Sequence, residues 1–184
     1  MHELKTPRIT LSYAALTAAV VLLTWVIHEA AHWAAGEALG NAMYMSLNAS
    51  GPVSGTYHAA TDETPVSAAG PLITLVQAVL AFALLRRGAS LRWVPVLFVP
   101  VYMRALAAVL NVINKNDEGR ISADLGLGTW TIPVLVTGFL VALAWVIIRR
   151  RALPTRFVVG TFLLIMLFAS VIVLADMAWK PHLL

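Results

Sequence analysis

The chain has 184 residues, of which 60% are hydrophobic and only 12% are charged, and its mean hydropathy is +0.81. A soluble domain of this size carries about 25% charged residues, so this composition excludes an ordinary soluble domain and indicates one integral membrane domain. The formal charge of +4 does not indicate nucleic-acid binding, because most basic residues flank apolar segments, as cytoplasmic loops do. The chain has no cysteine, so a metal ion would be held by His, Asp, Glu or water.

Residues 9–39 form the first apolar segment, which would be roughly 46 Å long as a helix and exceeds the hydrocarbon core of roughly 30 Å. It contains His28-Glu29-Ala30-Ala31-His32. On a helix the two histidines share one face and can reach one metal ion, while Glu29 can take a proton from a water on that ion. This pattern is a signature of zinc hydrolases. Ionisable residues are costly inside a membrane span, which favours a functional site here.

The loop at 41–64 is polar and rich in small residues. Strand-like residues at 43–47 and 53–57 flank a turn-like stretch, which predicts a short β-hairpin, with a simple surface loop as the alternative. An edge strand there could bind an extended peptide by strand addition. We expect His58 in this loop to be solvated. Glu37, about 140° round the helix from His32, should be exposed or capping rather than a metal ligand.

Four further spans are expected, at about 65–85, 91–113, 129–148 and 156–178, which makes the fold class all-α with about five transmembrane helices. The second span contains Ala69-Gly70-Pro71-Leu72, whose small residues would let another helix approach closely. In the third span, Pro95 and Pro100 should kink the helix. The same span holds Arg104, an intramembrane charge that needs an acidic partner or a water-filled cavity.

The connection at 111–124 is the densest polar stretch of the chain. Two histidines leave a catalytic zinc ion one protein ligand short, and the carboxylates that could supply it are Asp62, Glu63, Asp117, Glu118, Asp124 and Asp176. The connection is favoured because it is polar and close to membrane depth. Span parity also places it on the same side of the membrane as the end of the first span.

Basic residues alternate across the predicted spans. With the N-terminus inside, the cytoplasmic segments hold two, three and four Lys and Arg residues, and the opposite segments hold none, two and one. This bias predicts a cytoplasmic N-terminus and an outward-facing C-terminus. We expect the chain to lie in a prokaryotic cell membrane.

Three motifs together resemble those of site-2-protease-type intramembrane metalloproteases. In that family an H-E-x-x-H motif lies on one membrane helix, a small-small-Gly-Pro motif opens a later helix, and an Asn…Asp-Gly element supplies an aspartate ligand. The matching residues occur here in the same order between about 20 and 125, as His28-Glu29-x-x-His32, Ala69-Gly70-Pro71-Leu72 and Asn111…Asp117-Glu118-Gly119-Arg120. The last two spans carry no motif to match.

The resemblance implies a zinc-dependent endopeptidase in which His28, His32 and Asp117 bind Zn²⁺ and Glu29 is the general base. Asp124 is the alternative third ligand, because the Asp-Glu-Gly sequence of the connection allows two registers. The residues implied at the substrate or oxyanion are Asn111, Asn114, Gly70 and Pro71, and a capping or turn role is the alternative for the asparagines, Asn116 included.

The implied partners are a membrane-protein substrate, the lipid bilayer and an adaptor protein for substrate selection, with no nucleic acid. Two other functions stay open: a non-proteolytic metal-binding or transport protein, and an inactive protease-like scaffold. A structural alternative has the two histidines hydrogen-bonded between helices, with Glu29 paired to Arg104.

Overall fold

The computed structural model describes residues 7–179 and 183–184. Five of its helices are long and apolar enough to cross a membrane, which confirms the all-α membrane fold. The elements are α1 (Leu11–Ala38), β1 (Met43–Met45), β2 (Ser50–Pro52), the 3₁₀ turn η1 (Ala60–Asp62), α2 (Glu63–Arg86), the 3₁₀ turn η2 (Leu91–Trp93), α3 (Val94–Leu110), α4 (Asp117–Asp124), α5 (Thr131–Arg150) and α6 (Thr155–Trp179). The spans therefore agree with the predicted ones to within about three residues at each end.

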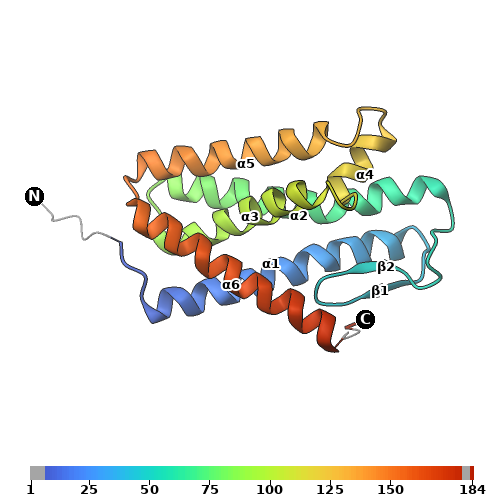
Figure 1. The fold of residues 1–184 in the computed structure, drawn as a ribbon, viewed down its shortest axis with the longest axis horizontal. Helices are drawn as coiled ribbons and strands as arrows, with labels where there is room; N and C mark the ends of the chain where they lie inside the picture. Colours follow the sequence, from blue (N-terminus) through green and yellow to red (C-terminus); the bar gives the residue numbers. More distant parts are fainter. Residues whose placement is uncertain (1–6, 180–182) are drawn as a thin grey trace, which may run out of the picture.

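The long helices run back and forth along one direction, as Figure 1 shows. The helix α1 packs against α2, α3 and α6, and α5 packs against α2 and α3. The C-terminal ends of α1 and α3, the short helix α4 and the hairpin all lie at one end of the bundle, and the turn that follows the arginines of α5 lies at the other (Figure 1). This arrangement confirms that the histidine motif and the polar connection share one side.

The interior of the bundle is apolar and closely packed. Phe98 of α3 stacks on Phe162 of α6 with ring centroids 4.8 Å apart, and Leu140 of α5 and Ile165 of α6 are fully buried. Large apolar side chains such as Leu163 also face outward. In a bilayer these outward faces would meet lipid, while the helices satisfy their own backbone hydrogen bonds.

The hairpin is shorter than predicted and shifted. The strands pair antiparallel with Met43 opposite Pro52, whereas the expected second strand at 53–57 is turn and loop. Leu47 follows β1 and is not paired with β2. Its backbone N–H donates to Asp176 Oδ1 at 2.9 Å. The other edge of β1 is paired as well, because Met45 exchanges backbone hydrogen bonds of 2.8 and 3.1 Å with Leu183 and Leu184. The outer edge of β1 is thus covered by residues 183 and 184, and only the outer edge of β2 could still pair with an extended peptide.

The middle of the chain differs in two details from what the sequence predicts. Pro95 falls in the first turn of α3, where a proline fits without breaking a helix, while Pro100 lies inside the helix. The connection was predicted only as polar, but its second half folds into α4. Asn116 caps that helix by accepting a hydrogen bond from the N–H of Gly119 at 2.7 Å. An asparagine cap followed by acidic residues is a recognisable helix start.

Candidate metal centre

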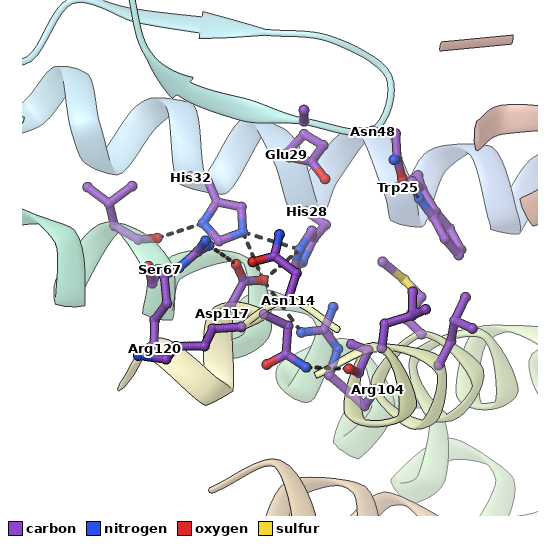
Figure 2. Close-up of a pocket in the computed structure, with 18 of the residues that line it drawn as sticks. Trp25, His28, Glu29, His32, Asn48, Ser67, Arg104, Asn114, Asp117 and Arg120 are labelled. Carbon is purple, nitrogen blue, oxygen red and sulfur yellow. Dashed lines mark hydrogen bonds and ion pairs between the residues drawn. The ribbon is translucent and has the colours of Figure 1, made fainter. Parts of the chain in front are cut away.

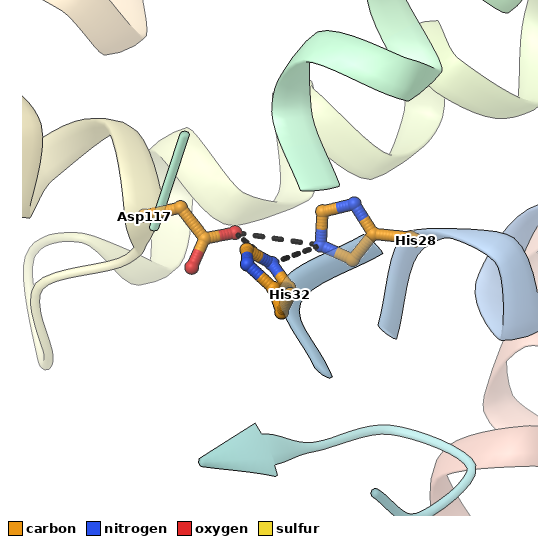
Figure 3. Close-up of side chains that lie close together, drawn as sticks. All are labelled: His28, His32 and Asp117. Atoms are coloured by element: carbon orange, nitrogen blue, oxygen red, sulfur yellow. Dashed lines mark hydrogen bonds and ion pairs between the residues drawn. The ribbon is translucent and has the colours of Figure 1, made fainter. Parts of the chain in front are cut away.

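Three potential metal ligands come together from two elements. His28 and His32 lie one turn apart on α1 and are 5% and 6% exposed, and Asp117 is the first residue of α4. The two Nε2 atoms are 3.2 Å apart, and each lies 3.4 Å from Asp117 Oδ2. Figure 3 shows the three side chains pointing at one another. Among the described residues, these three form the one group of ligand atoms close enough to hold an ion together.

The spacing of these atoms suits a tetrahedral zinc ion. Zinc–nitrogen and zinc–oxygen bonds of about 2.0–2.1 Å at tetrahedral angles place neighbouring ligand atoms about 3.3–3.4 Å apart. The three separations of 3.2, 3.4 and 3.4 Å are close to those edges. Three protein ligands would leave the fourth position for water or substrate, as in catalytic zinc sites.

The ring of His32 is oriented by the second membrane span. Its Nδ1–H donates a hydrogen bond of 2.6 Å to the backbone carbonyl of Val66 in α2. The proton on Nδ1 leaves the Nε2 lone pair free to bind a metal, which is the usual second-shell arrangement for a metal-binding histidine. Among the described residues, Nδ1 of His28 has no hydrogen-bond partner.

Gly70 lies directly against both imidazole rings. A Cβ atom on this residue would collide with His32 Nε2 and with His28 Cε1. The small-residue motif therefore has a specific purpose in this fold, because only glycine lets the α2 backbone come this close to the histidines. Pro71 is buried next to it, and its carbonyl accepts a hydrogen bond of 2.9 Å from Thr74 Oγ1.

We expect Gly70→Ala to lose bound zinc and to destabilise the fold, by about 1–3 kcal/mol as for other overpacked sites. The added methyl group must push one or both imidazoles out of place. The matched control is Gly138→Ala in α5, where an added Cβ meets no atom within 4 Å. Bound zinc and thermal unfolding of the two variants should be compared. If Gly70→Ala keeps its zinc at wild-type stability, the close approach of α2 to the two histidines is required neither for zinc binding nor for stability.

Asp117 is fixed through its second carboxylate oxygen. Arg120, three residues later on α4, donates from Nη2 to Asp117 Oδ1 at 2.7 Å and from Nε to Ser67 Oγ at 3.2 Å. Burial disfavours the charged carboxylate, but the contacts with His28 and His32 outweigh it and hold the pKa of Asp117 well below its usual value. The pairing of Arg120 with Asp117 was not predicted from the sequence, although the i, i+3 spacing of the two residues on a helix favours it.

The intramembrane cation Arg104 pairs with Glu118. Its Nη1 donates to Glu118 Oε1 at 2.8 Å, and the two residues are 4% and 2% exposed. This pair confirms the expected acidic partner. The alternative pairing of Arg104 with Glu29 was wrong, and Glu29 makes no ion pair within the described part of the chain.

A cavity of about 490 Å³ opens next to the triad. Glu29, 7% exposed, lies along its wall with both histidines, and Figure 2 shows its carboxylate on the cavity side of α1. The mouth carries polar groups that include Asn114 and Lys115, while Met103, Leu106 and Leu110 form an apolar side. Trp25 lines the cavity too and donates from Nε1 to Asn48 Oδ1 at 2.9 Å, which ties the hairpin turn to α1.

The remaining carboxylates and the loop histidine lie outside the triad. Asp124 Oδ2, the alternative third ligand, accepts a hydrogen bond of 2.6 Å from Thr64 Oγ1 at the far end of α4. Asp62 accepts from Asn41, Asp176 accepts from Leu47, and Glu63 lies 3.9 Å from Arg120. Glu37 is exposed and accepts from the N–H of Met43 at 2.8 Å, as a capping residue would, and His58 is exposed.

Two of the three asparagines are used to build the connection. Asn111 donates to the carbonyl of Thr129 at 2.9 Å and accepts from the N–H of Asn116 at 3.2 Å. Asn116 caps α4 and donates to the carbonyl of Ala107. Asn114, at the mouth of the cavity, is the remaining asparagine that substrate could reach.

No protein-family model, curated protein or solved structure matches this chain. The resemblance to site-2-protease-type enzymes therefore rests on the three motifs of the sequence.

Proposed function

We propose that this chain is an intramembrane zinc metalloprotease that hydrolyses peptide bonds of membrane-embedded substrates. The observation that supports it is the largely buried triangle of His28, His32 and Asp117, which has nearly tetrahedral spacing and borders a cavity lined by Glu29. A buried cluster of this kind in a membrane protein is costly and is most simply explained by a bound metal ion.

His28, His32 and Asp117 would hold the zinc ion. When bound, zinc lowers the pKa of a coordinated water from 15.7 to about 7 and polarises a carbonyl group. Glu29 accepts one proton from the attacking water while the water oxygen bonds to the carbonyl carbon and the π electron pair moves onto the carbonyl oxygen. Glu29 then delivers that proton to the amide nitrogen as the C–N bond breaks, which yields a carboxylic acid and an amine.

The cavity favours an unwound substrate segment. A peptide bond inside a membrane helix is shielded by its own backbone hydrogen bonds, so the segment must lose helical structure before it can be cleaved. Polar groups at the mouth, such as Asn114, can then bind the exposed backbone, while the apolar wall accommodates the side chains. With the N-terminus in the cytoplasm, this mouth would open on the outer side of the membrane.

Metal transport is the less favoured alternative. A transport pathway needs polar groups along the remaining spans, but α5 has no charged residue before Arg149 and its exposed face is largely apolar. The described structure instead concentrates its buried ionisable groups around one cavity at one end of the bundle.

The direct test is metal analysis and a cleavage assay on the purified protein. We expect one zinc ion per chain and cleavage of at least one member of a panel of single-helix membrane substrates. A chelator should stop cleavage, and added Zn²⁺ should restore it. A protein that binds no metal contradicts every metal-based function, and one that binds zinc without cleaving any substrate supports the scaffold or the transport alternative.

A further inference from the structure

The side chain of Arg104 reaches the metal triad from α3. Its Nη1 atom, which donates to Glu118, also lies 3.8 Å from Asp117 Oδ2, the oxygen that faces the two histidines. Arg104 lines the same cavity as Glu29, and Figure 2 shows it on the side of the cavity opposite α1. The permanent positive charge of Arg104 therefore lies next to the triad, where the scissile bond would be cleaved.

Arg104 retains a hydrogen-bond donor for a ligand. Its Nε atom is fully buried and has no partner among the described residues. The Nη2 atom also has no hydrogen-bond partner within residues 7–179 and 183–184, and unlike Nε it is not completely buried. Arg104 is one of the residues that line the cavity, so the cavity is where a ligand could meet this atom. A guanidinium carries five N–H donors, and here only one terminal nitrogen is used by Glu118.

The other donors near the triad are less suitable for a developing negative charge. The side-chain amides of Asn111 and Asn116 donate to backbone carbonyls within the connection and its neighbours. The guanidinium of Arg120 already donates hydrogen bonds to Asp117 and Ser67. Asn114 is neutral and exposed at the mouth. A preorganised, buried cation stabilises new negative charge more strongly than an exposed amide, because the effective dielectric constant around it is low.

We propose that Arg104 is a catalytic residue that donates a hydrogen bond from Nη2 to the scissile carbonyl oxygen as that oxygen becomes negative. The inference rests on the proposed protease function and assigns the oxyanion role to an arginine, where the sequence suggested asparagines. Glu118 neutralises Arg104 in the resting protein, so that the guanidinium is tolerated at membrane depth and stays in place. The new negative charge then adds a second partner to a cation that is already positioned.

The test compares kcat, KM and bound zinc in two Arg104 variants. The double variant Arg104→Met/Glu118→Leu removes both charges and so leaves no buried charge without a partner. We expect it to keep one zinc ion and to lose about 10²–10³-fold in kcat with little change in KM, as when an oxyanion donor is removed. Arg104→Lys keeps the charge and should lose less. Arg92→Met, which removes an exposed arginine of η2, before the N-terminal end of α3, is the control.

A second measurement separates catalysis from positioning. A phosphinic peptide, whose anionic oxygens resemble the charged transition state, should bind the double variant more weakly by about the factor lost in kcat/KM. Loss of zinc from both variants would overturn the inference, because Arg104 would then only position Asp117. Unchanged kcat with zinc retained would overturn it as well. Failure of the wild-type protein to cleave any substrate would instead overturn the proposed function, and this inference with it.

Discussion

Glu29→Gln is expected to abolish cleavage while the protein keeps its zinc. Glutamine has nearly the shape of glutamate but cannot accept the proton of the attacking water, and loss of a general base costs about 10²–10⁴-fold in rate. Glu29 is not part of the ligand triangle and makes no ion pair among the described residues. Its replacement therefore leaves no buried charge without its partner, and the fold should not change.

The measurement is the cleavage rate together with the zinc content of the same preparation. Glu37→Gln is the matched control, because it is the same substitution on the same helix at an exposed residue outside the cavity. The amide oxygen of the new glutamine can still accept the hydrogen bond from the N–H of Met43. Wild-type cleavage by Glu29→Gln would refute its role as the base, and loss of zinc would make Glu29 a structural part of the metal site.

Asp117→Asn is expected to lose the metal ion. An amide oxygen is a neutral and weaker ligand than the carboxylate Oδ2 that faces both histidines. The substitution also leaves Arg120 without its carboxylate partner next to a divalent cation. Loss of an outer-shell partner costs 10–100-fold in metal affinity, so loss of this direct ligand should cost more than about 100-fold.

Zinc affinity of Asp117→Asn should be measured by competition with a chelator of known affinity. Asp124→Asn provides the control, because it is the same substitution at the other end of α4, where the carboxylate accepts a hydrogen bond from Thr64. We expect Asp124→Asn to bind zinc as the wild type does. If Asp124→Asn alone loses zinc, then Asp117 is not the third ligand and α4 must rearrange when the metal binds.

Local patterns in the sequence determined where the membrane spans lie and that His28 and His32 share one side of a helix. Apolar runs of membrane length identified the five long helices, and the four-residue spacing of His28 and His32 put both rings on one side of α1. Helix geometry also correctly placed Glu37 away from the triad, where it accepts a hydrogen bond from the N–H of Met43. These features depend on residues close together in the chain, so helical spacing alone is enough to predict them.

Only the tertiary structure decided which distant residues meet. From the sequence, both Asp117 and Asp124 were candidates for the third ligand. In the structure the connection forms α4, and this helix places Asp117 next to the histidines of α1 and Asp124 next to Thr64. The partner of Arg104 was likewise open, since an intramembrane cation can pair with any acid that packing brings near it. Contacts between residues this far apart in the chain depend on how the helices pack and where they are capped. Local sequence patterns do not predict that packing.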